Sequence, residues 1–361
     1  WRFTRPCGAL TFSARARFAP PPGKDNAPTR FVAKFSPAQS TTPAMMLKAI
    51  FGAEAHWYND VLPEDQGLGR PEAIYIGAKL AHKRFWRRMP VFCMLFEVMP
   101  KSLYSRTSGC DNLVHVKQVV QALGTFHARW WSHPKEHPVE FISKPTTDNC
   151  GLLIHALIYA MGRIKALGCF GDVYDPILAQ SGVIKKHIRY MMRELYKPPH
   201  TVCHGDVHLD NIFFSDQFGK TLEGIKLIDF GNMVFMPGTF DLAYFLGQNL
   251  EPELRRAHER ELVGLYHERL VEQGVSDADY SFEQCFRSYR FQYWRVLINI
   301  IFVCFSDFAK QARKRTGMFA DSPRHADSKL KATYDAINKR MSTAMVELKC
   351  VELLEEEGKR G

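Results

Sequence analysis

Three polar side chains in one stretch of the chain have the types and the spacing that suit phosphoryl transfer. Asp206 comes first, Asn211 follows five positions later, and Asp229 ends a second apolar run. The apolar runs at 212–214 and 225–228 flank a polar turn that contains glycine, which predicts a β-hairpin. Because a hairpin brings its two ends together, we expect Asn211 and Asp229 to face one another.

The expected chemistry follows from the charge of a transferring phosphoryl group. Such a group carries dispersed negative charge, so catalysis consists mostly of positioning and of neutralisation by metal ions. Mg²⁺ prefers hard oxygen ligands, usually one or two carboxylates completed by substrate phosphates and water. Asp229 offers a carboxylate and Asn211 a carbonyl oxygen, whereas Asp206 is placed to accept a proton from an attacking hydroxyl.

The motif around these residues resembles the catalytic core of kinase-like phosphotransferases that act on small molecules. These are the aminoglycoside phosphotransferases, the choline/ethanolamine kinases and the ecdysteroid kinase-like (CHK kinase-like) group. Their shared pattern is His-Gly-Asp, an Asn five positions after the Asp, and an Ile-Asp-Phe strand end, and it stands here at 204–211 and 228–230. The alternative is a buried hairpin with incidental acids, which needs three spaced polar residues and both strands to agree by accident.

The resemblance implies that Lys34 and Glu54 bind the nucleotide. In kinase-like folds a lysine on the third strand contacts the α- and β-phosphates of ATP, and Lys34 lies on a predicted strand. A helix predicted at 42–62 carries Glu54 off its apolar stripe, as expected for the partner of Lys34. His56 or Asp60 are the alternative polar contacts, and ordinary surface charge is the other explanation of Glu54. We also expect Lys34 to lie outside the core, so that Lys34→Ala leaves the fold intact.

The backbone from Glu97 to Met99 is expected to meet the adenine ring. The strand predicted at 89–98 resembles the strand that enters the hinge between the lobes, where adenine needs main-chain donors and acceptors. The glycine-rich phosphate loop departs from the family pattern, since only Gly8 precedes the strand predicted at 9–18. The sequence leaves open whether this loop has been truncated or has diverged. It also leaves open whether this region contacts the β- and γ-phosphates.

The resemblance implies an α+β fold, the two-lobed protein-kinase-like fold, over nearly the whole chain, although its motifs are specific only at 204–242. Residues 1–98 are the expected β-rich, nucleotide-binding N-terminal lobe, and residues 99–361 the larger, mainly helical C-terminal lobe that carries catalysis and substrate binding. The predicted strands are 9–18, 30–35, 73–82 and 89–98. Helical periodicity is found at 112–131, 152–195, 241–246, 254–274, 282–305 and 328–357. The last residues, 355–361, are predicted to be frayed.

Two features disfavour a protein substrate. Protein kinases have a long activation segment closed by Ala-Pro-Glu, but here only residues 233–240 separate the Asp-Phe-Gly motif from an apolar helix. His208 also stands where protein kinases usually carry lysine. We interpret Asp241 as a structural residue that caps this helix or ties it to the catalytic loop, and His127 as a hydrogen-bonded core histidine.

Composition narrows the class of protein. The chain of 361 residues is 46% hydrophobic, ample for a packed core, and its net charge of +10 suits a polyanionic ligand such as ATP. A basic surface that only aids solubility is the preferred explanation of the charge alone, and no nucleic-acid-binding module is recognised. The nine cysteines are scattered and none forms Cys-x-x-Cys, which indicates a reducing compartment and a cytoplasmic location. The apolar run at 296–305 is too short to span a bilayer, and the first residue, Trp1, leaves open where the natural chain starts.

These observations and the resemblance together predict an ATP- and Mg²⁺-dependent kinase of a small hydroxylated molecule. Its partners would be ATP and an alcohol acceptor that the sequence does not identify, with no nucleic acid, no membrane span and no obligate protein partner. The alternative is a catalytically inactive, nucleotide-binding pseudokinase.

Overall fold

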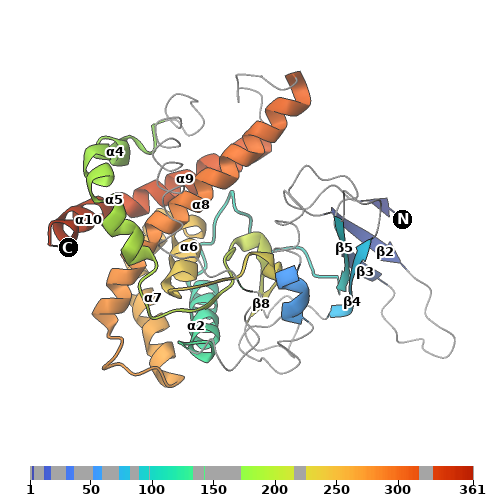
Figure 1. Cartoon of the computed structure of the whole chain (residues 1–361), viewed down its shortest axis with the longest axis horizontal. Coiled ribbons are helices and arrows are strands. Elements are labelled where there is room, and N and C mark those ends of the chain that lie inside the picture. Colours follow the sequence, from blue (N-terminus) through green and yellow to red (C-terminus); the bar gives the residue numbers. More distant parts are fainter. Residues whose placement is uncertain are drawn as a thin grey trace.

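The structure is a computed structural model. It describes residues 2–3, 12–17, 30–35, 52–58, 73–81, 89–96, 98–132, 142, 172–214, 225–316 and 328–360. A β-sheet and a larger group of helices lie on opposite sides of the molecule (Figure 1). The short helical segment 52–58 lies between them, beside β8.

The sheet is antiparallel and has five strands in the order β1-β2-β3-β5-β4. Its strands are β1 (Arg2–Phe3), β2 (Phe12–Arg17), β3 (Arg30–Phe35), β4 (Ala73–Ala81) and β5 (Met89–Phe96). The predicted strands match β2 to β5 within a few residues. Lys34 lies on the central strand β3, opposite Ser13 of β2 and Met94 of β5.

The helical part is built around α6 (Thr239–Asn249), whose 11 residues are all buried. Around it pack α2 (Leu113–Arg129), α7 (Pro252–Glu272), α8 (Phe282–Thr316) and α9 (Ser328–Glu347). The other described helices are α4 (Asp175–Leu178), α5 (Ser181–Leu195) and α10 (Cys350–Gly358). Because α6 is buried on every side, any polar residue on it needs a partner inside the protein.

Two small antiparallel ribbons hold the motif residues. One pairs β6 (Thr201–Cys203) with β9 (Val234–Met236), and the other pairs β7 (Ile212–Phe214) with β8 (Ile225–Leu227). The second pair is the predicted hairpin, with Ile212 opposite Leu227. The stretch 204–211 connects β6 to β7, and we call it the catalytic loop after the role expected from the sequence.

The C-terminal region differs from its predicted form in two ways. The single helix predicted at 328–357 is two helices, α9 and α10, separated at Lys349, whose φ is 52°. Arg290 donates to the carbonyl oxygens of Leu348 (2.8 Å) and Lys349 (3.0 Å), and so satisfies backbone groups released by the break. The predicted fraying is also wrong as far as Gly358, because Arg287 of α8 pairs with Glu357.

Among the described helices, none is long and apolar enough to cross a membrane. Four cysteines in the described part of the chain are free thiols, and all four are buried.

Candidate active site

The hairpin places Asn211 beside the residues that follow β8. The main-chain N–H of Ile228 donates to the carbonyl oxygen of Asn211 at 3.1 Å, one residue before Asp229. The Asn211 side-chain N–H donates in turn to the main-chain oxygen of Asp206 at 3.0 Å. The three residues that sequence spacing singled out therefore lie on one hydrogen-bonded unit.

The carboxylate of Asp206 is held by donors on both of its oxygens. Oδ1 accepts from the Tyr244 hydroxyl at 2.6 Å, and Oδ2 accepts from the Asn232 side chain at 3.3 Å. His208 Nε2 lies 3.6 Å from Oδ2. Burial opposes the charge on this group, but His208, Tyr244 and Arg106 outweigh it and lower the pKa of Asp206. Asp206 is therefore a fixed anion that can orient a hydroxyl by accepting its hydrogen bond.

Asn211 and Asp229 form a donor set that fits Mg²⁺. The Asn211 side chain is nearly buried and its nitrogen donates to Asp206, so its oxygen is the atom suited to bind a metal. The Asp229 side chain is 39% exposed. Its backbone is left-handed, with φ 68° and ψ 60°, a conformation that is unusual for a residue with a side chain and occurs often at functional sites. One carboxylate and one carbonyl oxygen are the hard ligands that Mg²⁺ takes together with phosphates.

Lys34 connects the sheet to this donor set. Its Nζ lies 2.5 Å from Glu54 Oε2 and 2.7 Å from Asp229 Oδ1, so it bridges two carboxylates. Burial disfavours its charge, but both carboxylates outweigh that effect and the pKa of Lys34 is raised. Burial also raises the pKa of Glu54 to about 7, against the opposing effect of Lys34. Lys34 therefore stays positively charged in the protein.

The expectation that Lys34 lies outside the core is wrong. Its side chain is 11% exposed and that of Glu54 only 1% exposed. The error has a physical reason: Glu54 of the mostly buried segment 52–58 pairs with Lys34, and Tyr58 of the same segment packs 4.9 Å from Phe96 on the neighbouring strand β5.

Aromatic packing fixes the backbone on either side of Asp229. The ring of Phe230 stacks on Trp57 at 5.5 Å, and Trp57 in turn contacts Trp130 at 5.6 Å. Tyr58 meets Phe230 edge-on at 5.9 Å. The segment that carries Glu54 and the motif that carries Asp229 are therefore packed against each other, which keeps both carboxylates within reach of Lys34.

Asp241 organises the catalytic loop from inside the helical part. Its carboxylate accepts the main-chain N–H groups of His204 at 2.6 Å and Gly205 at 2.9 Å, and lies 3.2 Å from His127 Nε2. Of the two structural roles expected for Asp241, the structure contains the tie to the loop, since Asp241 makes no side-chain cap to α6. His127 is fully buried and hydrogen-bonded, as expected.

His204 closes the same network on the other side. Its Nδ1 accepts the main-chain N–H of Asp206 at 3.3 Å, so the proton is on Nε2, which donates to the Ile228 carbonyl at 3.1 Å. Burial lowers the pKa of His204, consistent with this neutral form. His204 therefore links the catalytic loop to the strand end that carries Asp229.

The hinge residues are only partly described. Glu97 lies outside the described residues. Met99 is half-buried in the irregular stretch that follows β5, and its backbone runs toward the helical part of the chain.

Sequence reasoning missed Tyr244, Asn232 and Arg106, which all act on Asp206. The only signal was indirect: Tyr244 is a hydroxyl-bearing residue three positions after Asp241 in an apolar helix. Its partner could not be identified without knowing which face of α6 meets the catalytic loop.

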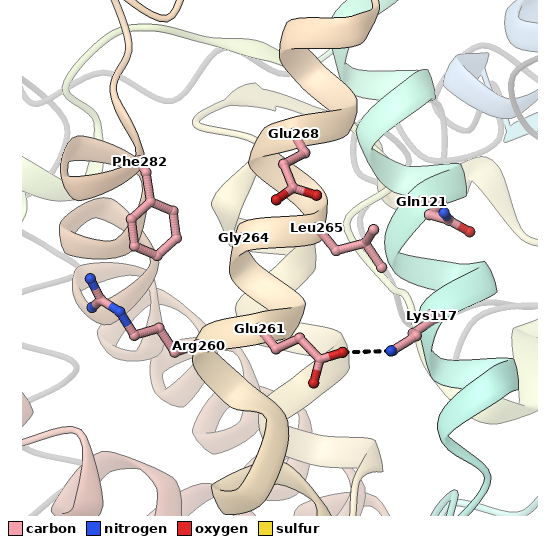
Figure 2. A pocket seen from close by; sticks show the side chains of 8 residues that line it. All are labelled: Lys117, Gln121, Arg260, Glu261, Gly264, Leu265, Glu268 and Phe282. Carbon is pink, nitrogen blue, oxygen red and sulfur yellow. Dashed lines mark ion pairs between the residues drawn. The ribbon is translucent and has the colours of Figure 1, made fainter.

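A surface hollow elsewhere in the molecule is unrelated to these residues. It lies between α2 and α7, and the ion pair between Lys117 and Glu261, 2.5 Å long, crosses it (Figure 2). The guanidinium of Arg260 lies 4.7 Å from the ring of Phe282 at its other side. None of the motif residues lines it.

Comparisons with known proteins show which sequences and folds this chain resembles. Residues 175–276 match the model of the ecdysteroid kinase-like family. No curated protein matches the chain. A choline kinase from Cryptosporidium parvum Iowa II superposes with a TM-score of 0.50 at 12% identity, over 97% of this chain and 89% of that one.

Two further solved structures are similar at lower TM-scores. An ethanolamine kinase from Plasmodium vivax gives 0.48 at 14% identity, over 96% of this chain and 81% of its own. An aminoglycoside 2'-phosphotransferase-IIIa, solved as its GDP complex, gives 0.49 at 14% identity, over 98% of this chain and 90% of its own. The chain thus resembles the kinase-like small-molecule phosphotransferases, in sequence at the motif-bearing segment 175–276 and in fold over nearly its whole length.

Proposed function

We propose that the protein is an ATP- and Mg²⁺-dependent kinase that phosphorylates the hydroxyl of a small molecule. One observation carries the proposal: Lys34 bridges Glu54 and Asp229, while Asn211 joins that unit to Asp206. These residues come from the sheet, the 52–58 segment, the hairpin and the catalytic loop. Their types are those that phosphoryl transfer needs for positioning and charge neutralisation.

Each residue has a proposed role. Asp229 and Asn211 would hold Mg²⁺, which would neutralise the charge of the phosphates. Lys34, oriented by Glu54, contacts the α- and β-phosphates. Asp206 orients the acceptor hydroxyl and receives its proton as the new bond to phosphorus forms. Its lowered pKa means that orientation is its main contribution and that proton acceptance comes late.

The proposed function also assigns roles to the two lobes and to the hinge between them. Residues 1–98 would be the nucleotide-binding lobe and 99–361 the catalytic and substrate-binding lobe, with adenine against the backbone of Glu97 to Met99. The acceptor is a small alcohol, and a cytoplasmic location would supply the ATP.

The direct test is ATP consumption in the presence of Mg²⁺ and a panel of alcohols, run beside calorimetric binding of Mg·ATP. Transfer to at least one alcohol, abolished in Asp206→Asn, supports the kinase. Binding without transfer to any alcohol would identify a pseudokinase. Absence of Mg·ATP binding would contradict both functions.

A further inference from the structure

Asn249, the last residue of α6, is a buried amide that bonds two backbone groups of the catalytic loop. Its Oδ1 accepts the main-chain N–H of Leu209 at 3.2 Å, and its Nδ2 donates to the carbonyl oxygen of Val207, also at 3.2 Å. Val207 and Leu209 are fully buried and Asn249 is 1% exposed, so water cannot take over these bonds if the amide is removed. One side chain therefore pairs a donor and an acceptor of the loop.

The amide of Asn249 is itself fixed in place. Its Nδ2 also donates to the carbonyl oxygen of Phe245, one turn earlier in α6, at 3.1 Å. The opposite orientation of the amide would set its oxygen against two carbonyl oxygens, so the network determines which end faces which group. The main-chain oxygen of Asn249 accepts the N–H of Cys110 at 2.7 Å. The position of the bonded part of the loop therefore follows the position of α6.

The bonds from Asn249 reach the loop between its two proposed functional residues. Asp206 directly precedes the first bonded residue, and Asn211 lies two positions after the second. Asp241, eight positions earlier on α6, accepts the two main-chain N–H groups that come just before Asp206. The buried helix thus holds the loop on both sides of Asp206.

We infer that Asn249 is a positioning residue for phosphate transfer, which sets the place of Asp206 relative to Asn211. The inference rests on the proposed kinase function. Asn211 is also held from the hairpin, through the main-chain N–H of Ile228 at 3.1 Å, so it keeps its place beside Asp229 when the bonds from Asn249 are lost. Asp206 then shifts relative to the metal site, and a misplacement of about 1 Å can cost about a hundredfold in rate. Loss of Asn249 should therefore lower the rate of transfer more than the affinity for Mg·ATP.

The test compares Asn249→Ala with Asn338→Ala, which removes a matched amide. Asn338 is fully buried on α9, donates to the carbonyl oxygen of Tyr334 one turn earlier at 2.7 Å, and accepts the Tyr174 hydroxyl at 2.7 Å. Both changes delete a buried amide and its bond within the helix, but only Asn249→Ala deletes bonds to the catalytic loop. Thermal unfolding of both variants shows how much stability each has lost.

Two further measurements separate the rate from binding. Single-turnover release of phosphate from saturating Mg·ATP, with water as the acceptor, gives a rate that needs no knowledge of the alcohol, and calorimetry gives the Kd of Mg·ATP. We expect Asn249→Ala to slow the release about tenfold or more and to change the Kd about threefold or less. Asn338→Ala should leave both within about twofold of the parent protein. If the parent does not use water, the best alcohol of the panel takes its place.

A rate for Asn249→Ala equal to that of Asn338→Ala overturns the inference and leaves the kinase proposal intact. A loss of Mg·ATP affinity as large as the loss of rate also overturns it, because the whole site would then have been disturbed. Mg·ATP binding by the parent without transfer to water or to any alcohol overturns the kinase proposal and the inference with it. Where Asn249→Ala does not fold, Asn249→Ser decides, since a serine hydroxyl can bond the carbonyl one turn earlier in the helix but is too short to reach the loop.

Discussion

Asp206 and Asp229 have the same side chain but different surroundings, which suit the different roles proposed for them. Asp206 accepts hydrogen bonds from Tyr244 and Asn232 and lies near His208 and Arg106, all of which favour its anion. Asp229 is more exposed, left-handed in backbone, and bonded to Lys34. One carboxylate is thus surrounded by donors that hold it in place, and the other is open to a ligand.

This difference predicts that the two isosteric variants fail in different ways. Asp206→Asn should still bind Mg·ATP but transfer phosphate about a hundredfold more slowly, the loss typical of a removed proton acceptor. Asp229→Asn removes a hard anionic ligand, so metal-dependent nucleotide binding itself should weaken. Calorimetry beside single-turnover rates measures both, with the exposed Asp335→Asn as control. Equal loss of Mg·ATP binding in the two site variants contradicts the assigned roles.

Lys34 and Lys117 make ion pairs of equal length but unequal burial. The Lys34 side chain is 11% exposed against 38% for Lys117, and both pairs with a glutamate measure 2.5 Å. Lys34→Ala should lower the free energy of unfolding by about 3 kcal/mol, because Glu54 is left buried and unpaired. Lys117→Ala should change it by about 1 kcal/mol at most. Urea denaturation of both variants checks this, and equal effects would show that burial does not control the outcome.

The pKa of Glu54, about 7, also makes stability depend on pH. The folded protein holds a proton on Glu54 in the range where the unfolded chain, with its ordinary glutamate pKa near 4.5, has lost it. Glu54 therefore makes the free energy of unfolding fall as pH rises from about 4.5 to 7. Glu54→Gln should remove this contribution, so its stability should fall less than that of the parent across the same window. Chemical denaturation at several pH values measures the two slopes, and identical slopes contradict the assignment.

At the scale of elements, the catalytic loop depends on a glycine. Gly205 has φ +83°, and a Cβ there would clash with the carbonyl oxygen of Asn232, on the segment that supplies a donor to Asp206. An L-residue would also pay for the left-handed backbone, which costs about 1–2 kcal/mol. The loop can therefore keep both its bonds to Asp241 and its approach to Asn232 only with glycine.

We accordingly expect Gly205→Ala to lower the free energy of unfolding by about 2 kcal/mol or more and to reduce phosphate transfer. Gly182→Ala in α5 is the matched control, since nothing lies within 4 Å of the added Cβ. That change should be neutral or stabilising by up to about 1 kcal/mol. Thermal unfolding of both variants makes the comparison. A Gly205→Ala protein as stable as the parent would mean that the loop can shift away from Asn232.

Sequence patterns predicted these elements unequally. The hairpin of β7 and β8 was predictable because two apolar runs flank a polar turn, and this alone brings Asn211 next to Asp229. The short strands β6 and β9 were not, since each has three residues and pairs with a partner far along the chain. The break at Lys349 was missed for a similar reason: Arg290, which satisfies the released carbonyls, comes from another helix. Local sequence periodicity carries no information about partners that lie so far away in the sequence.

At the scale of the molecule, the described parts of the sheet and of segment 52–58 meet the motif segments through an ion pair and an aromatic stack. Lys34 reaches Asp229 across 195 positions of sequence, and Trp57 stacks on Phe230. The ion pair supplies the charge matching and the aromatic stack supplies the apolar burial. In this arrangement, the carboxylate proposed to bind the metal is already paired with a side chain of the protein.

Lys34 is an internal counter-ion of Asp229, and nucleotide binding as proposed above would therefore be an ion exchange. Under the proposed function, phosphate oxygens would replace Asp229 on Lys34 and Asp229 would become available to Mg²⁺, so every charge would keep a partner. Mg²⁺ without nucleotide has no such exchange, because it must compete with Lys34 for the carboxylate. Lys34→Ala should therefore change the two affinities in opposite directions. In calorimetric titration, Mg²⁺ alone should bind about tenfold more tightly than to the parent protein, while Mg·ATP should bind more weakly. Unchanged affinity for Mg²⁺ alone would mean that Lys34 does not compete with the metal for Asp229. Nucleotide and metal could then bind in either order.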